Sequence, residues 1–310
     1  MDYLLGGTAA MCAGFFSNPF DVIKTRQQLQ GELQSTKGAP QPYRGVYQSI
    51  RSIIKAEGVW GLQKGLGSAL TFQFVMNSSR LGLYQTVEDW NWTKLDKDKS
   101  HHSTVLCVFW GGVSGVLGSA LGCPFYMIKT QLQAQSVGKY AVGYQHHHQN
   151  TLNALVNIVQ KQGYLGLWRG FSGIVPRTAV ASSAQLGTFS ACKDIFVQYE
   201  IFQKSFLLTA IGSSMVSGFF AVVCMTPFDV VATRMFNQGV DKNGKGLLYT
   251  NIVDCFIKTF RYEGMKGLYK GFVPNYWRTA PHTILNLTFW EQFKRWKNIY
   301  LAEEGAVYFE

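Results

Sequence analysis

Long stretches of small and apolar residues are separated by polar segments along the whole chain. The first stretch, LLGGTAAMCAGFF, ends at a proline, an acid and two bases in SNPFDVIKTRQ. No stretch offers some twenty unbroken apolar residues, because Gly, Ser, Thr or an ionisable residue interrupts each one. Any membrane-spanning helix of this chain must therefore shield polar groups inside a bundle.

The same pattern occurs three times, which is the most informative feature of the chain. A proline followed by charged or polar residues recurs at nearly equal intervals, in PFDVIKTR (19–26), PFYMIKTQ (124–131) and PFDVVATR (227–234). A second phrase follows each of them, in EGVWGLQKG (57–65), QGYLGLWRG (162–170) and EGMKGLYKG (263–271). The sequence therefore indicates three copies of one structural unit.

Each unit predicts an apolar helix that ends past its proline, a polar loop, a short amphipathic helix and a second apolar helix. The short helix is clearest in NTLNALVNIVQKQG, where Leu152, Leu155, Val156 and Val159 recur at helical spacing. We therefore predict an all-α membrane protein with six transmembrane helices. The units are 1–96, 97–203 and 204–299, followed by a C-terminal tail at 300–310, and 90–103 and 198–205 are linkers.

Composition agrees with a membrane protein, since 47% of residues are hydrophobic and only 15% are charged. The net charge of +11 suits nucleic acid, an anionic membrane surface or an anionic substrate equally well. A soluble nucleic-acid binder would gather its bases with aromatic residues on one face, whereas these bases follow the repeat. We therefore expect no nucleic-acid partner.

Signals of enzyme or metal chemistry are weak. The chain contains no phosphate-binding loop, metalloprotease motif or nucleophile elbow, so we expect no enzyme activity. His146, His147 and His148 are consecutive on a polar loop, which fixes no ligand geometry, and we expect no metal. The six cysteines form no C-x-x-C pair and fit small apolar roles. The N-terminus lacks the basic flank of a secretory signal.

The two repeated phrases resemble the mitochondrial carrier family, solute carrier family 25, over essentially the whole chain. That family is marked by a threefold P-x-[DE]-x-x-[KR] followed by [DE]-G-x-x-x-x-aromatic-[KR]-G. The variants PFYMIKTQLQAQ, TPFDVVATR and APHTILNLTFWEQ resemble its oxaloacetate-carrier-like branch. The resemblance implies a multi-pass protein of the mitochondrial inner membrane, with pseudo-threefold symmetry and the short helices on the matrix side, that exchanges solutes by alternating access as a monomer.

The charges near the three prolines predict their own pairing. If each acid position faces the base position of the next repeat around a threefold axis, every charge is used. The resulting pairs are Asp21 with Lys129, Asp229 with Lys24, and the uncharged Tyr126 with Ala232. The opposite order leaves two charges unpaired. The resemblance implies the first order as well.

We interpret these pairs as a matrix gate that breaks when substrate binds, although static ion pairs would give the same pattern. The resemblance further implies that helix kinks at Pro19, Pro124 and Pro227 place the pairs, and that Gln28 and Gln133 brace them, with Phe236 replacing the third glutamine. Tyr126 and Ala232 depart from the family pattern at one pair.

A second set of residues resembles the family's cytoplasmic gate. Its positions are filled by Gln85, Lys193, Glu291 and Lys294, and a Glu88 stands where the first repeat should carry a base. Only one acid position is filled by an acid, so at most one ion pair can form. We therefore expect this gate to be the weaker one.

Residues that break the threefold symmetry are the best candidates for contact with an asymmetric substrate. Counted from the last glycine of each second phrase, three arginines point towards one midplane volume, with polar residues beside them. The candidates are Arg177, Thr178, Arg278, Thr279, Arg80, Phe72, Gln73, Asn77, Ser182 and His282. Arginine matches carboxylates bidentately, so the set suits a small dicarboxylate, although a lone arginine can also be structural. The resemblance implies that Arg177, Thr178 and Arg278 fall on the family's contact points, in the manner of oxo-acid carriers.

The second phrase carries a further prediction, because a helix N-terminus beside a base favours phosphate. The resemblance implies bound cardiolipin, with no other cofactor, at Gly58, Lys64, Gly65, Gly163, Arg169, Gly170, Gly264, Lys270 and Gly271. A simple anchor at the membrane surface is the alternative. For the whole protein, the missing third pair leaves open a carrier-like membrane adaptor or proton leak.

Overall fold

The structure is a computed structural model that describes residues 2–33, 41–92, 104–196, 198–199, 206–241 and 244–307. Within these ranges the regular elements are helices, which confirms the predicted all-α class. The long helices are α1 (Asp2–Leu29), α3 (Leu66–Asp89), α4 (Thr104–Ala134), α6 (Phe171–Phe196), α8 (Phe206–Asn237) and α10 (Phe272–Val307). The short ones are α2 (Gly45–Glu57), α5 (Thr151–Gln162) and α9 (Ile252–Leu268), with 3-10 turns η1 (Val59–Gln63), η2 (Gly138–Tyr140) and η3 (Tyr164–Trp168).

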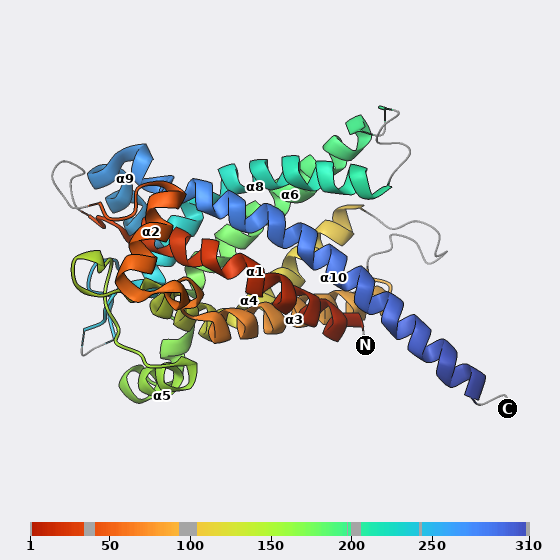
Figure 1. Ribbon diagram of the computed structural model, residues 1–310, viewed down its shortest axis with the longest axis horizontal. Coiled ribbons are helices and arrows are strands. Elements are labelled where there is room, and N and C mark those ends of the chain that lie inside the picture. The colour runs from red at the N-terminus through yellow and green to blue at the C-terminus, as the bar shows by residue number, and fades with distance from the viewer. Residues whose placement is uncertain are drawn as a thin grey trace.

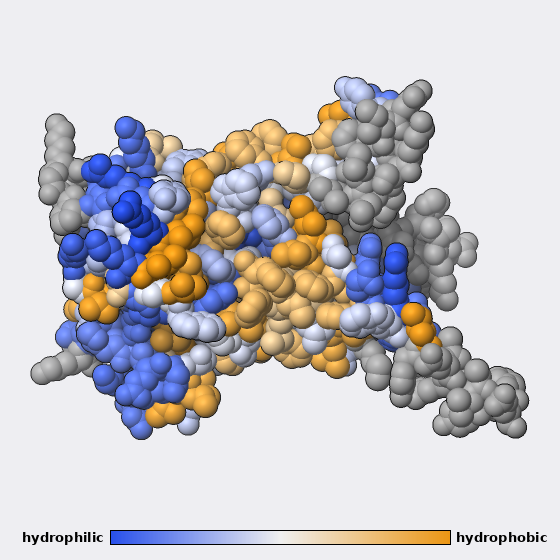
Figure 2. All heavy atoms as spheres, viewed as in Figure 1, coloured by the Kyte–Doolittle hydropathy of each residue, from blue (hydrophilic) through white to orange (hydrophobic). Residues whose placement is uncertain are grey.

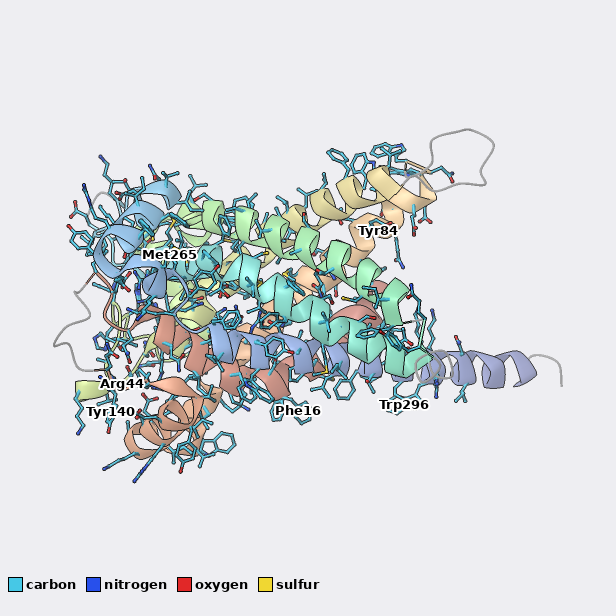
Figure 3. All side chains as sticks on the ribbon, turned by 90° about the horizontal axis from the view of Figure 1, so that it is seen from above. Phe16, Arg44, Tyr84, Tyr140, Met265 and Trp296 are labelled. Atoms are coloured by element: carbon cyan, nitrogen blue, oxygen red, sulfur yellow. The ribbon has the colours of Figure 1, made fainter. Side chains whose placement is uncertain are left out.

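The long helices close a ring. Each one contacts the next in chain order, and α10 returns to contact α1. Figure 1 shows the short helices α2, α5 and α9 together at one end of the bundle, and both chain termini towards the other. We call these the short-helix end and the terminal end. Figure 3 shows Arg44, Tyr140 and Met265 at the short-helix end, and Trp296 towards the terminal end.

The first helix of each unit continues past its proline. Pro19, Pro124 and Pro227 lie inside α1, α4 and α8, which end further on at Leu29, Ala134 and Asn237. These extensions bring the charged residues after each proline to the short-helix end. The predicted linkers lie mostly outside the described residues, whereas residues 300–307 of the predicted tail continue α10.

The apolar residues of α5 lie in two different environments. Asn150 caps the helix by accepting a hydrogen bond from the Asn153 N–H at 2.8 Å. The core side is formed by Ala154 and Ile158, which are buried. Leu152 is 76% exposed, although periodicity placed it on the apolar stripe with Leu155. Leu155 and Val159 pack against this core from partly buried positions, so one part of the apolar stripe of α5 faces the core and another part, with Leu152, faces outward.

Surface hydropathy fits a membrane protein. On the face in Figure 2, apolar residues gather over the middle of the long helices and hydrophilic residues gather at the short-helix end. Within the described residues, segments 109–134 of α4 and 212–237 of α8 are long and apolar enough to span a membrane by length and composition alone. The other long helices carry more polar groups, as the sequence pattern indicated.

Candidate functional site

Two buried ion pairs connect the proline-containing helices at the short-helix end. Lys24 Nζ lies 2.8 Å from Asp229 Oδ2, which joins α1 to α8. Lys129 Nζ contacts Asp21 Oδ2, which joins α4 to α1. All four side chains are buried. The helices thus adopt the order in which each acid faces the base of the next unit, and not the opposite order.

The third position contains aromatic rings in place of an ion pair. Tyr126 lies between Phe72 and Phe236, with ring centroids 5.0 and 5.2 Å away. Ala232 belongs to the same buried cluster, and a side-chain carbon at Gly173 would lie 3.1 Å from the Ala232 Cα. A long base at position 232 would therefore have no room. The contact between α4 and α8 at this level is apolar where the other two are ionic.

The two predicted bracing glutamines make different contacts. Gln28 Nε2 donates to Asp229 Oδ2 at 2.8 Å, and its oxygen accepts from the Thr233 hydroxyl at 2.7 Å. Gln133 donates to Asn18 Oδ1 at 3.0 Å and accepts from the Thr25 hydroxyl at 3.1 Å. Gln28 thus contacts the ion-paired Asp229 directly, whereas Gln133 contacts the uncharged Asn18 and Thr25.

Two of the candidate substrate arginines contact the same aspartates. Arg177 Nε lies 2.6 Å from Asp229 Oδ1, and Arg278 Nε lies 3.6 Å from Asp21 Oδ1. Each aspartate is therefore shared between a lysine on a proline-containing helix and an arginine on α6 or α10. Arg177 also lies over the Tyr126 ring at 5.4 Å. The sequence treated gate and substrate residues as separate sets, and the structure joins them.

The third candidate arginine has a different environment. Arg80 is exposed, and it has no ion pair among the described residues. A side-chain carbon at Gly115 would lie 4.0 Å from Arg80 Cδ and 3.8 Å from Thr178 Cγ2. The side chains of Arg80 on α3 and Thr178 on α6 therefore both lie beside Gly115 of α4. Ser182 is half-buried on α6.

The remaining candidates form a polar cluster between α1, α3 and α10. His282 contacts Ser17 Oγ at 3.2 Å through Nδ1 and Gln73 Nε2 at 3.3 Å through Nε2. Asn77 donates to the backbone oxygen of Gln73 at 2.8 Å. The Thr279 hydroxyl bonds within α10, to the Asn275 oxygen at 2.8 Å. Phe72 belongs to the aromatic cluster described above.

The predicted gate at the terminal end is not closed by ion pairs among the described side chains. Glu291 is exposed and has no ion pair there, and Lys294 lies over the Trp290 ring at 3.8 Å. Gln85 is half-buried on α3. The side chain of Lys193 lies outside the described part of the chain. The ion pairs between helices that the described residues show therefore lie at the short-helix end.

The structure also reveals two buried arginines that sequence analysis missed. Arg26 donates to Glu57 Oε2 at 2.9 Å and to the Tyr43 hydroxyl at 3.2 Å. Arg234 makes a bidentate contact with Glu263, at 2.6 and 2.8 Å. Both arginines are fully buried. Each fastens the end of a proline-containing helix to the short helix of its own unit.

These contacts outweigh the effect of burial on the two glutamates. Burial alone would raise the pKa of Glu57, but hydrogen bonds from Arg26 and Lys64 hold that pKa below its usual value. The same balance, with Arg234 and Lys270 as donors, lowers the pKa of Glu263. Both carboxylates therefore stay ionised at neutral pH.

The residues predicted to bind lipid already have protein contacts. Lys64 Nζ lies 2.7 Å from Glu57, Lys270 Nζ lies 2.6 Å from Glu263, and Arg169 donates to the Gly239 oxygen at 3.4 Å. Gly65 has a φ of +68°, and a side-chain carbon there would lie 3.2 Å from the Lys129 oxygen. Gly170 and Gly271 also have positive φ and pack against the next unit, whereas Gly58, Gly163 and Gly264 have positive φ and open space. These glycines thus have a structural reason that is independent of lipid.

The histidine row contacts the helices of two units. His146 Nε2 lies 2.8 Å from the Asn237 oxygen, and His148 Nε2 lies 3.0 Å from Gln131 Oε1. His147 is exposed on the same loop. Across the described residues, no group of three or more His, Cys, Asp and Glu is arranged to hold a metal ion.

Comparison with known proteins shows similarity along the whole chain. The family model described as mitochondrial carrier protein matches residues 1–95, 100–200 and 203–300. The chain is 47% identical over 300 residues to solute carrier family 25 member 35 of Mus musculus, covering 97% of this chain and 99% of that protein. It is 39% identical over 293 residues to the mitochondrial oxaloacetate transport protein of Saccharomyces cerevisiae, covering 94% and 87%. It is 37% identical over 290 residues to mitochondrial citrate transporter E of Aspergillus niger, covering 94% and 91%.

Proposed function

Because the chain belongs to the mitochondrial carrier family, we propose that it moves a small dicarboxylate or oxo-dicarboxylate across the mitochondrial inner membrane by alternating access. The short-helix end faces the matrix and the terminal end faces the cytoplasmic side. One observation carries the proposal: Arg177 and Arg278 each contact a gate aspartate. The aspartates thus occupy the places that two substrate carboxylates would take.

The relatives support this substrate class. One is named for oxaloacetate transport and another for citrate transport, and both anions carry more than one carboxylate. The relatives are described as carriers and transport proteins rather than enzymes. Arg177 and Arg278 occupy one position of the repeat, which Phe72 fills in the first unit, and such a break in the threefold symmetry suits an asymmetric anion of this kind.

The geometry couples substrate binding to opening. A dianion that enters from the terminal end meets the exposed Arg80 first and then competes with Asp229 and Asp21 for the other two arginines. Arginine binds a carboxylate bidentately, so a well-placed substrate replaces the contact that it breaks. Each aspartate then keeps only its lysine, and the closed end loses part of what stabilises it. The ligand shifts the equilibrium only by its differential affinity for the two states.

Lipid binding belongs to the same proposal. The helices α3, α6 and α10 begin just after Gly65, Gly170 and Gly271, and their first N–H groups are available to a lipid phosphate. Cardiolipin, with two phosphates, suits these sites between units. Because Lys64 and Lys270 are already paired with glutamates, the backbone supplies most of the binding there. The protein works as a monomer, since one ring of helices contains both gates.

The test is uptake by liposomes that contain the purified protein. Oxaloacetate, malate, malonate and sulfate are offered as labelled substrates to vesicles preloaded with the same panel. Arg177→Ala should reduce exchange of the transported anion at least tenfold, because it removes a contact worth more than about 1.4 kcal/mol. Arg261→Ala, at an exposed arginine on α9, is the matched control and should leave exchange unchanged.

Two outcomes would contradict the proposal. Unchanged dicarboxylate exchange in a folded Arg177→Ala variant would remove Arg177 from the substrate site. No exchange of any anion by folded wild-type protein would favour a membrane adaptor or proton leak over a carrier.

A further inference from the structure

Glu32, a half-buried acid with one fully buried carboxylate oxygen, lies at the short-helix end, in the turn that follows α1. Glu32 lines a cavity of about 500 Å³ that is bounded by loops of all three units. The other lining residues include Gln30 and Pro42 from the first unit, the basic Lys139 and Tyr144 from the second, and Leu247 from the third. Tyr140, next to Lys139, is labelled at this end in Figure 3. The cavity therefore lies at the proposed matrix mouth, beyond the gate.

Among the described acids that have a buried carboxylate oxygen, Glu32 differs from Asp21, Asp229, Glu57 and Glu263 because no base pairs with it. Asp21, Asp229, Glu57 and Glu263 each lie within ion-pair distance of a base. Glu32 has no such partner among the described residues, and its Oε1 is buried without a hydrogen bond there. The Tyr249 hydroxyl beside it is also buried and lacks a well-formed hydrogen bond within the same part of the chain. The site thus contains an acceptor and a hydroxyl whose hydrogen-bonding capacity is not fully used.

The turn that carries Glu32 is fixed in place by the third unit. The Leu33 N–H donates to Glu263 Oε1 at 2.9 Å, and Lys270 Nζ donates to the Gln30 oxygen at 2.8 Å. Moving the buried oxygen of the Glu32 carboxylate into water therefore requires this turn to move away from the third unit. Separation at this seam is what opening of the proposed gate requires, since Lys24 and Asp229 join the same two units.

The bases near Glu32 compensate little of the negative charge that its carboxylate would carry when ionised. Arg234 on α8 and Lys270 before α10 are both ion-paired with Glu263, whose negative charge offsets most of their effect on Glu32. Burial raises the pKa of Glu32 to about 7, against the lowering effect of Arg234, the Tyr249 hydroxyl and Lys270. The negative charge of Glu263 raises that pKa further.

We propose that Glu32 is a proton-binding site through which matrix pH controls opening of the matrix end. The site binds one proton from the matrix when this end is closed and releases it to the matrix when the turn moves away. Because the closed gate separates the cavity from the substrate arginines, this proton is not carried across with the anion. The sidedness rests on the function proposed above.

The direction of the effect follows from proton linkage. The closed state holds Glu32 with a pKa of about 7, and in the open state hydration returns it to the ordinary value of 4.5. The closed state therefore binds the proton more tightly. Its advantage is complete at low pH and is lost as pH rises from about 4.5 to about 7. Between pH 6 and 8 the ratio of open to closed protein should rise about tenfold.

The first experiment titrates the site without transport. The carboxyl stretching band of the purified protein is followed by infrared difference spectroscopy between pH 5 and 9. Wild-type protein should show a carboxyl that titrates near pH 7, and Glu32→Gln should lose it. Asp254→Asn removes an acid on α9 that pairs with Lys258, and it should keep the band. A wild-type band that persists in Glu32→Gln would overturn the proposal.

The second experiment varies the pH inside liposomes in which the matrix end faces inward, at constant external pH. Exchange should accelerate several-fold from internal pH 6 to 8, and this response should be absent in Glu32→Gln. A Glu32→Gln profile identical to wild type would also overturn the proposal. If no anion is exchanged at any pH while the infrared band titrates near pH 7, the proton site stands and the proposed transport function fails.

Discussion

At the scale of single residues, the two gate aspartates differ in how closely an arginine approaches. Arg177 Nε lies 2.6 Å from Asp229, whereas Arg278 Nε lies 3.6 Å from Asp21. A base placed at position 229 would therefore meet Arg177 at close range. Reversal of charge should be tolerated better at the Asp21 pair than at the Asp229 pair.

We predict that Asp21→Lys and Lys129→Asp each abolish transport, and that the double variant recovers part of it. The exchange of Lys24 and Asp229 should recover less, because like charges then face each other at position 229. Initial rates of anion exchange in liposomes measure both, with the amount of folded protein checked for each variant. Recovery that is larger at the Lys24 and Asp229 pair, or absent at both, would contradict this order.

How much of the site could be predicted depended on repetition. The pairing of Asp21 with Lys129 follows from the threefold pattern, because the charges themselves exclude the opposite order. The contact between Arg177 and Asp229 could not be predicted, since it depends on side-chain reach across α6 and α8. Symmetry-breaking residues were taken to face a substrate, and the pattern gave no sign that they also contact protein acids.

The buried arginines carried a signal that could have been used. Arg26 and Arg234 occupy one position of the repeat, and Glu57 and Glu263 occupy another. In the second unit both positions change together, to Gln131 and Gln162. Loss of a base and an acid together indicates that the two side chains meet, because a lone buried charge is costly. The same reasoning had found the departure at Tyr126 and Ala232.

At the scale of elements, the short helix α5 shows where periodicity falls short. Periodicity identified the helix and its amphipathic character, but did not distinguish Leu152 from the residues that face the core. In the structure Ile158 is 3% exposed and Leu152 is 76% exposed. A helix that lies at the proposed membrane surface has two apolar environments, the protein core and the lipid, and spacing alone cannot distinguish them.

We predict that Ile158→Ala lowers the free energy of unfolding by about 2–5 kcal/mol, because it leaves a cavity in the core. Leu152→Ala removes a side chain of the same size from an exposed position and should change it by less than about 0.5 kcal/mol. Thermal unfolding in detergent compares the two, and Ile158→Ala should melt several degrees lower. If Leu152→Ala lowers the melting temperature more than Ile158→Ala does, Leu152 packs against the core and the orientation of α5 in the structure is wrong.

At the scale of the whole molecule, the three contacts between units at the short-helix end are unequal. Lysine–aspartate pairs join the first unit to the second and to the third, whereas the second and third units meet through the apolar contact of Tyr126, Phe236 and Ala232 and through the Arg177–Asp229 pair. The second unit also lacks the buried arginine and glutamate of the other two. Neutral residues thus replace the lysine–aspartate pair at one of the three contacts, which leaves the two lysine–aspartate pairs of the first unit, with Arg177 and Arg278 beside them, to control opening.

The same arrangement predicts that the interior is reached from one side only. The paired charges lie at the short-helix end, and Arg80 is exposed within the ring of helices. With the native cysteines replaced by serine, Arg80→Cys should react with an impermeant thiol reagent added at the terminal end, and much more slowly at the other. Arg261→Cys, exposed on α9, should show the reverse preference. Mass spectrometry of oriented vesicles measures both.

Removal of the two gate aspartates should reverse this preference in part. Asp21→Asn together with Asp229→Asn leaves four bases without these acids, which are the buried Lys24 and Lys129 and the half-buried Arg177 and Arg278. An unpaired buried charge costs several kcal/mol, and hydration of these bases through an open short-helix end relieves that cost. The thiol of Arg80→Cys should therefore react faster, in this background, with reagent added at the short-helix end. Equal labelling with and without the aspartates would mean that the ion pairs hold the bundle together without controlling access.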